Sequence, residues 1–198
     1  MNSRFYLQCE DNDPSYPLVV PKIRMKNTKF VCADYAGNEN IGQELSIDIV
    51  IYDNVPNDPR ARRKHKKRLN LYDQAVRYKY GVRQEFGFAK NLIIKLFSLQ
   101  TAEKLKAGRR RLMKDAHLMN REPDQYMSAL LVVIYDKIMY PVEVIRDPVI
   151  REDITFEGRK LPVPAEPEKF LEIQFGDYMK LPPEEDRKAH IIKMYQVE

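Results

Sequence analysis

The stretch Leu45–Pro56, LSIDIVIYDNVP, limits the possible folds of this chain more than any other feature. Between Ile47 and Tyr52, five residues are apolar or aromatic and four are β-branched, a composition typical of a β-strand. Successive side chains of a strand point to opposite faces, so the three isoleucines of this stretch share one face. We expect that face to be buried, which requires a sheet in the fold.

Asp48 interrupts this apolar run, and its spacing leaves two interpretations open. It is either a solvated or hydrogen-bonded carboxylate on a half-exposed face, or a metal ligand on a rigid strand. Phosphoryl-transfer sites bind Mg²⁺ through two or three converging carboxylates. No Asp-x-Asp spacing supplies a second ligand on this strand face, and Asp53 is predicted to begin the following turn.

The composition predicts a single soluble globular domain over residues 1–198, because 32% of the residues are charged and 43% are apolar. The longest apolar run, Ala129–Tyr135, is far shorter than the roughly 20 residues of a membrane-spanning helix. The N-terminus shows no apolar core of a secretory signal. Cys9 and Cys32 suggest neither a disulfide framework nor a metal site, so a cytoplasmic location is predicted.

The net charge of +5 is concentrated in one run, Arg60–Arg68 (RARRKHKKR), without which the chain would be net negative. This run can be a solvated helix face, or a contact for an anionic membrane or a polyanionic glycan. Nucleic acid is disfavoured, because no aromatic residues are interleaved with the cations. The seven cations are Arg60, Arg62, Arg63, Lys64, Lys66, Lys67 and Arg68.

Two strands are predicted before the one that contains Asp48. They cover Arg4–Gln8 and the extended stretch Pro17–Met25, and a turn over Tyr35–Gln43 follows them. In the second strand, Lys22 and Arg24 are two residues apart. Both cations therefore lie on one face, about 7 Å from each other.

Two helices are predicted next. Asp58 and Pro59 are typical of the N-cap and first position of a helix. Its apolar stripe contains Leu69, Tyr72, Val76 and Tyr80. The second helix covers about residues 89–106 and is predicted to be broken at Gly108. Its apolar face contains Leu92, Ile93, Leu96, Phe97 and Leu99.

The rest of the chain is predicted to contain one buried strand, Ser128–Tyr135, and an extended surface segment. Seven of the thirteen prolines lie between Pro141 and Pro183, so that segment cannot form a core of its own. One helix, Glu166–Gly176, interrupts it and ends at the glycine. These elements predict an α+β fold.

Catalytic motifs are missing from the sequence. The three histidines, His65, His117 and His190, do not have the spacing of a metal site or a catalytic triad. The sequence also contains no glycine-rich phosphate loop and no serine or cysteine in a nucleophile motif. Judged by spacing alone, the chain is an α+β domain with one unusual aspartate.

The C-terminal stretch Ile154–His190 nevertheless resembles one known family. It contains FEG…PVP followed by FGDYMKLPPEE, a combination similar to the end of the LicD family of phosphocholine and polyol-phosphate transferases, which are related to fukutin. Upstream, Tyr16–Phe30 and Ile41–Pro56 resemble the middle section of that family in the same order. The resemblance covers nearly the whole chain and is weakest in the helices between about Arg60 and Met127.

This resemblance implies a partial nucleotidyltransferase-like sheet with packed helices and a proline-rich C-terminal wrap. It also implies transfer of a phospho-alcohol, such as phosphocholine, from a CDP-activated donor to a cell-surface glycan (lipopolysaccharide or teichoic acid), with Mg²⁺ as cofactor. Asp48 corresponds to one of three metal-binding carboxylates, and Lys22 and Arg24 are expected to face the donor phosphate.

In the LicD family, a helix, a glycine-rich segment and an Asp-rich strand precede the part that Arg4–Gln8 resembles. We therefore expect residues 1–198 to be the C-terminal part of a LicD-type domain that lacks two of the three metal carboxylates and is inactive by itself. The alternative is a non-catalytic module that binds an anionic glycan or the inner membrane face through the basic run.

The same expectation gives a stability prediction for Asp48. If it is buried without a counter-charge, Asp48→Asn should raise the melting temperature at pH 7–8.

Overall fold

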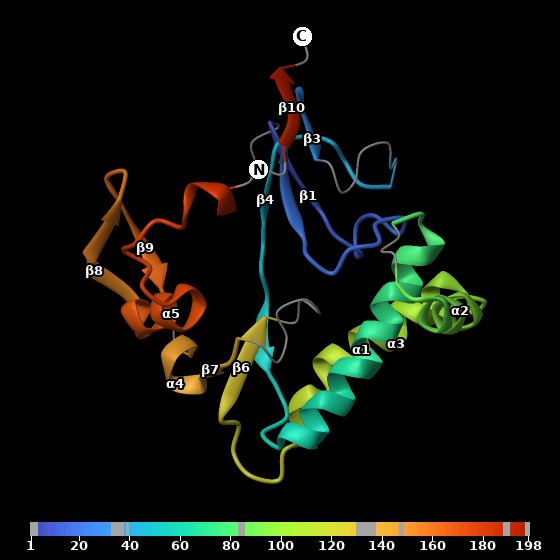
Figure 1. Cartoon of the computed structure of the whole chain (residues 1–198). Helices are drawn as coiled ribbons and strands as arrows, with labels where there is room; N and C mark the ends of the chain where they lie inside the picture. The colour runs from blue at the N-terminus through green and yellow to red at the C-terminus, as the bar shows by residue number, and fades with distance from the viewer. Residues whose placement is uncertain are drawn as a thin grey trace.

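The computed structural model describes residues 4–32, 38, 40–82, 86–129, 138–146, 149–187 and 191–196. Small antiparallel sheets and helices alternate along these residues, which confirms the predicted α+β class. Figure 1 shows the long helices on one side of the molecule and the C-terminal hairpin on the other, with strands between them. The nucleotidyltransferase-like arrangement of the sheet stays a prediction.

The N-terminal sheet consists of β1 (Phe5–Gln8), β2 (Lys22–Met25) and β4 (Ser46–Asp48), in the spatial order β1-β2-β4. Strands were predicted at all three places, although β2 is shorter than the predicted extended stretch. A second pair, β3 (Thr28–Cys32) with β10 (Ile191–Gln196), was not predicted. It joins an early segment to the far end of the chain, and both strands lie at the top of Figure 1.

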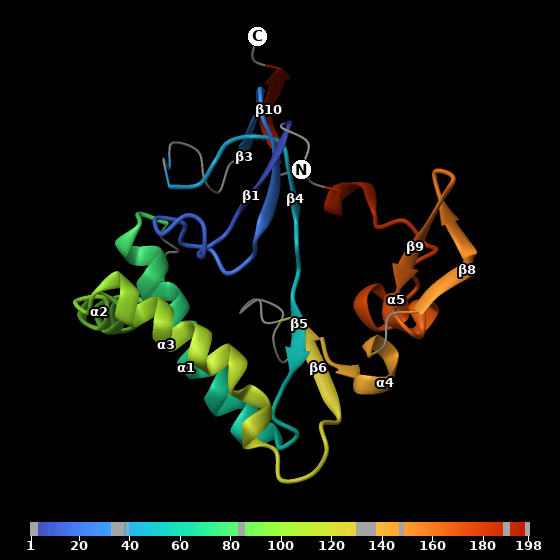
Figure 2. The same ribbon diagram turned by 180° about the vertical axis from the view of Figure 1, so that it is seen from behind.

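The strand predicted around Asp48 is in fact divided between two sheets. β4 ends at Asp48, and β5 (Tyr52–Asn54) pairs with β6 (Tyr126–Ala129), which pairs in turn with β7 (Tyr140–Pro141). Figure 2 shows β5 and β6 side by side. The predicted buried strand of the second half therefore begins at Tyr126, and its residues 130–135 lie outside the described part of the chain.

The three isoleucines of the predicted strand are not buried, contrary to expectation. Ile47 is 72% exposed, and Ile49 and Ile51 are 39% and 45% exposed. The register explains this result. Ile23 of β2 lies opposite Ile47, and the polar residues that alternate with them point to the other face, where Arg24 is almost fully buried. The sheet thus packs its polar side inward, and sequence pattern alone assigns the wrong face.

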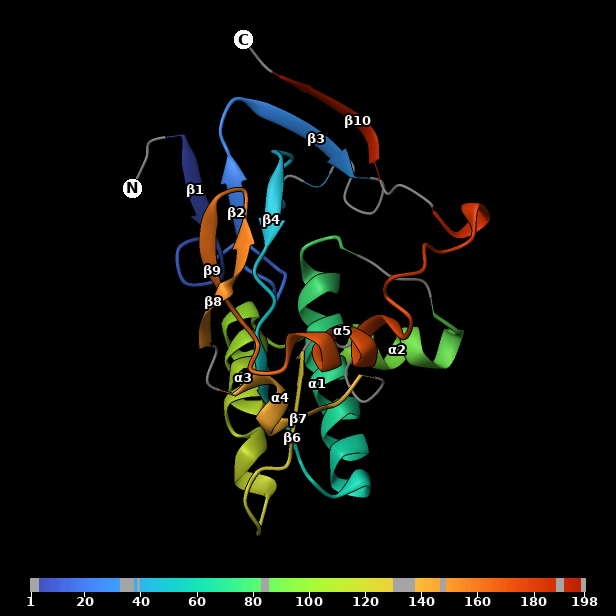
Figure 3. The same ribbon diagram turned by 90° about the vertical axis from the view of Figure 1, so that its left-hand side faces the viewer.

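The helix α1 (Pro59–Lys79) begins as predicted, because the Asp58 carboxylate accepts a hydrogen bond from the Ala61 amide at 2.6 Å. It lies beside α3 (Ala102–Lys114) in all views (Figures 1–3). Val76 of α1 and Leu105 of α3 belong to one buried cluster, with aromatic rings packed around it. The predicted apolar stripe of α1 is therefore confirmed as a core face.

The helix predicted over residues 89–106 is instead two helices, α2 (Phe88–Phe97) and α3. They separate because Thr101 caps α3, with its hydroxyl oxygen 3.3 Å from the Lys104 amide that donates to it. Most of the predicted apolar face of α2 is exposed, including Leu92 at 46% and Leu96 at 58%, and Ile94 is the buried position.

Gly108 does not break a helix. It lies inside α3, where a β-carbon would come within 2.2 Å of the Tyr72 ring of α1. The glycine therefore allows α1 and α3 to approach each other closely, and this packing outweighs its poor helix propensity. A short 3₁₀ helix, Ala116–Met119, follows α3.

The proline-rich segment contains more structure than predicted. The short helix α4 (Val142–Ile145) is followed by a hairpin of β8 (Val149–Phe156) and β9 (Arg159–Val163). The chain reverses at Glu157 and Gly158, which both have positive φ angles of 47° and 75°. Figure 1 shows this hairpin at the edge of the molecule, away from the N-terminal sheet. Residues 149–163 are therefore extended, as predicted, but the sequence pattern did not indicate that they pair as a hairpin.

The predicted helix in this segment is confirmed as α5 (Pro167–Phe175), which ends at Gly176 with φ 69°. Phe170 attaches it to the molecule. Its ring stacks on Tyr140 with centroids 4.6 Å apart and meets the edge of Tyr52 at 5.7 Å. A 3₁₀ turn, Glu184–Asp186, comes later.

Candidate functional site

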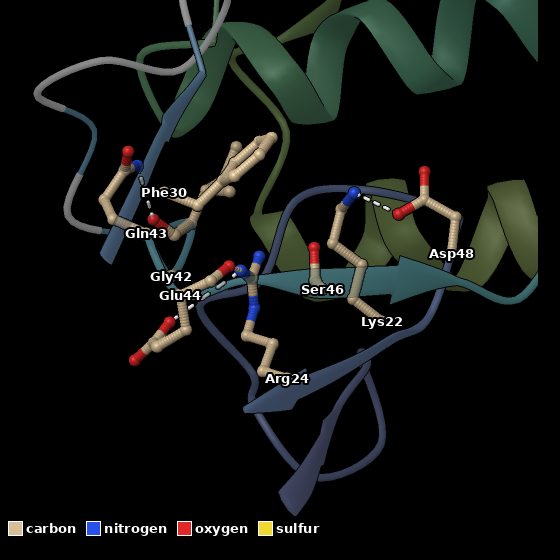
Figure 4. Close-up of a pocket in the computed structure, with 9 residues that line it drawn as sticks. Lys22, Arg24, Phe30, Gly42, Gln43, Glu44, Ser46 and Asp48 are labelled. Carbon is tan, nitrogen blue, oxygen red and sulfur yellow. Dashed lines mark hydrogen bonds and ion pairs between the residues drawn. The ribbon is translucent and has the colours of Figure 1, made fainter. Parts of the chain in front are cut away.

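The three site residues predicted from the sequence meet in one pocket of about 280 Å³ beside the N-terminal sheet (Figure 4). Lys22 and Arg24 of β2 lie on the same strand face, as predicted. The antiparallel register places Lys22 opposite Asp48 and Arg24 opposite Ser46 on β4. The lining residues are Lys22, Arg24, Phe30, Ile41, Gly42, Gln43, Glu44, Ser46 and Asp48.

Asp48 forms an ion pair with Lys22, whose ammonium group donates a hydrogen bond to its carboxylate. The Asp48 side chain is 51% exposed and that of Lys22 is 12% exposed. The expectation of a buried Asp48 without a counter-charge is therefore wrong. The physical reason is that β4 is an edge strand of the described sheet, and the register brings a lysine directly across from the aspartate.

Arg24 is held by the protein from several sides. Only 2% exposed, it donates from Nε to Gln8 Oε1 at 2.7 Å and from Nη1 to the Glu44 carbonyl at 3.2 Å. These contacts use the fixed fork of the guanidinium group, which lysine does not have. Of the two predicted cations, Lys22 is thus the more accessible, and Arg24 forms the wall of the pocket.

Glu44 also lines this pocket, although the sequence did not lead us to predict it as a site residue. Its Oε2 atom is buried, has no hydrogen-bond partner among the described residues, and lies 3.8 Å from Arg24 Nη1. Burial and the adjacent Glu44 carboxylate raise the pKa of Tyr6 to about 12. The alternation Glu44, Ser46, Asp48 in ELSID was the available signal, because residues at this spacing share a strand face.

Gly42 makes room for the buried charges of the pocket. A β-carbon at this position would come within 2.4 Å of Glu44 Oε2 and 2.8 Å of Arg24 Nε. A side chain at this position would therefore have to shift the Glu44 carboxylate or the Arg24 guanidinium group.

The described residues do not fit a Mg²⁺ centre by themselves. Glu44 and Asp48 are about 13 Å apart along an extended chain, at roughly 3.3 Å per residue, and each faces a cation. Within the described part of the chain, no group of three His, Cys, Asp or Glu side chains could hold a metal ion. Metal binding by Asp48 therefore stays a prediction from the resemblance.

The basic run occupies the N-terminal part of α1, and most of its cations are exposed. Arg62 is an exception. It is half-buried, donates to the carbonyl oxygens of Pro56 at 2.9 Å and Asn57 at 3.3 Å, and lies over the Tyr126 ring. Arg62 therefore anchors the start of α1 against β6. The exposed members are Arg60, Arg63, Lys64, Lys67 and Arg68.

Helices of the described residues are all too short or too polar to cross a membrane.

Comparison with curated proteins finds a relative of this chain. The chain is 30% identical to the lipopolysaccharide cholinephosphotransferase LicD of Haemophilus influenzae over 158 residues, which cover 75% of this chain and 56% of that protein. The chain thus spans about half the length of the curated relative that it matches. No family model matches the chain, and no solved structure does. This similarity supports membership of the LicD family, which is the family that the sequence motifs resemble.

Proposed function

We propose that this chain forms part of a transferase that moves phosphocholine, or a related phospho-alcohol, from a CDP-activated donor to a cell-surface glycan. The similar protein of Haemophilus influenzae is named a lipopolysaccharide cholinephosphotransferase, which supports this choice of group and acceptor. The observation that carries the proposal is the pocket in which Lys22, Arg24 and Asp48 meet.

In this proposal, Lys22 binds the donor phosphate. Its ammonium group lines the pocket beside the half-exposed carboxylate of Asp48, so it is accessible and is held in one orientation. Arg24 supplies a fixed positive charge, because its hydrogen bonds to Gln8 and Glu44 hold its guanidinium group in the wall of the pocket. A phosphate in the pocket would meet both cations, in competition with the Asp48 and Glu44 carboxylates that face them.

Mg²⁺ enters this proposal only through Asp48. The described carboxylates do not converge, so no step of the proposed reaction is derived through a metal. If Asp48 is a ligand in the working enzyme, further carboxylates must come from residues outside the described set.

Calorimetric titration with CDP-choline, with and without Mg²⁺, tests the proposal. We expect Lys22→Met to weaken binding about tenfold or more, because a charge-assisted hydrogen bond is lost. Lys26→Met is the matched control, since Lys26 is exposed and does not line the pocket. The proposal fails if the wild-type chain does not bind CDP-choline, or if both substitutions weaken binding equally.

A second candidate function is a module that binds an anionic glycan or membrane surface. The specific observation in its favour is the cluster of five exposed cations on α1. Binding to anionic vesicles or polyanionic glycan should then fall steeply with salt, since the Debye length shrinks from about 10 Å at 0.1 M to about 3 Å at 1 M. The double substitution of Arg60 and Arg63 by Gln should remove it, and no association at low salt would leave only a solvated helix face.

A further inference from the structure

A second pocket lies between α1 and α3, away from the candidate transferase site. It has a volume of about 440 Å³, within the range of about 300–1,000 Å³ that is usual for small-ligand sites. It shares no lining residue with the pocket of Lys22 and Asp48. Figure 1 shows the two helices that form it running side by side.

Positive charge converges on this pocket from both helices. Lys64 and Arg68 are four residues apart on α1, so their side chains lie on one face, and Arg111 approaches from α3. The described residues include no carboxylate in ion-pair range of Lys64 or Arg68. Like charges four residues apart repel each other, so an anion between them would stabilise this arrangement.

One carboxylate, that of Asp115, also lines the pocket. It lies 3.4 Å from Arg111 Nε, and both side chains are well exposed. Such an exposed pair is weak, so Asp115 orients Arg111 without cancelling the positive charge of the pocket. Three cations face one carboxylate here.

The floor of the pocket is rigid before any ligand binds. His65 is only 2% exposed, and its Nε2 donates a hydrogen bond to the Leu112 carbonyl at 2.7 Å, which connects α1 to α3. Burial lowers the pKa of His65, and the positive charge of Arg68 acts in the same direction. Tyr72 packs tightly over Gly108 in the same groove. The cations at the rim therefore stand on a preformed base.

We propose that this pocket binds a phosphate group, as a monoester or diester, between Lys64, Arg68 and Arg111. Guanidinium groups match the geometry of phosphate oxygens, and cations from two helices can surround a tetrahedral anion. The phosphate belongs either to a soluble phosphorylated compound or to the headgroup of an anionic phospholipid. The site does not depend on the transferase proposal, because it uses none of the same residues.

The first experiment titrates the chain with inorganic phosphate at low salt. Arg68→Gln and Arg111→Gln should each weaken binding about tenfold. Lys67→Gln is the matched control, because it removes one exposed charge from the same run but not from the pocket. All three positions are exposed, so circular dichroism should show an intact fold. The proposal is overturned if the wild type does not bind phosphate, or if Lys67→Gln weakens binding as much as Arg68→Gln.

A second experiment separates the two sources of the phosphate. One arm uses glycerol phosphate in solution, and the other uses phosphatidylcholine vesicles with and without phosphatidic acid. Binding in either arm that Arg68→Gln removes and Lys67→Gln leaves intact supports the site and identifies the source. Binding that depends equally on both residues indicates only a diffuse positive field and overturns the proposal. Since neither arm contains CDP-choline, failure here is distinguishable from failure of the proposed transferase function.

Discussion

At the scale of single residues, the ion pair between Asp48 and Lys22 reverses the stability prediction for Asp48. Because Asp48 pairs with Lys22, we now expect Asp48→Asn to lower the free energy of unfolding by up to about 1 kcal/mol. Urea denaturation should show a smaller loss at high salt, since the Asp48 side chain is 51% exposed and the attraction is screened. Asp11→Asn is the control, because Asp11 is also exposed. A higher melting temperature for Asp48→Asn at pH 7–8 would contradict the ion-pair account.

At the scale of elements, a buried ionic network connects helices α1 and α3. Arg109 of α3 is fully buried and donates from Nη1 to Asp73 Oδ1 of α1 at 2.6 Å and to the Pro17 carbonyl at 2.9 Å. Arg109→Met should cost about 3–5 kcal/mol of stability, because it leaves the buried Asp73 with only one cationic partner, Arg77.

The neighbouring Arg110 provides the control for this network. Its side chain is 53% exposed and pairs with Glu10 at 3.5 Å, so Arg110→Met should change the unfolding free energy by at most about 1 kcal/mol. Denaturant unfolding measures both values. Equal losses for the two substitutions would show that the network contributes little beyond surface charge.

His65, which also connects α1 and α3, makes this helix pair sensitive to acid. Burial lowers its pKa from the ordinary 6.5, so the unfolded chain takes up a proton at a higher pH than the folded chain does. The contribution of neutral, buried His65 to the free energy of unfolding is fully present above pH 6.5 and is lost as the pH falls below it. Lowering the pH from 7 to 5 should therefore reduce the melting temperature of the wild type more than that of His65→Gln. The exposed His117→Gln variant is the control, and identical pH profiles for all three proteins would contradict this account.

We expect the whole molecule to show no transferase activity unless residues outside the described set supply further metal ligands beside Asp48. In-line displacement between two metal ions about 3.5–4 Å apart needs ligands on both, and the described residues bring no second and third ligand to Asp48. We expect no CMP release when the purified 198-residue chain is incubated with CDP-choline and Mg²⁺. Mg²⁺-dependent release that Asp48→Ala abolishes would contradict this prediction.

Local sequence by itself determined several features of this protein. The start of α1 depends on Asp58 and Pro59, whose capping contacts lie within a few residues. The shared face of Lys22 and Arg24 follows from the two-residue period of a strand, and the C-cap at Gly176 follows from its free backbone. The family motifs are likewise contiguous stretches. Such features need no knowledge of distant residues, so they were predictable.

Only the tertiary structure decided which residues meet and which faces are buried. Lys22 and Asp48 are 26 residues apart, and the β2–β4 register that pairs them also leaves Ile47 exposed. Gly108 lies inside a helix because the Tyr72 ring of another helix occupies the space of its side chain. These outcomes depend on contacts between segments that are remote in the chain, and hydrophobic periodicity does not encode the partner of a face. For that reason the pattern predicted the strand and the helices and allowed for a half-exposed, hydrogen-bonded Asp48, but it wrongly assigned the isoleucine face to the core.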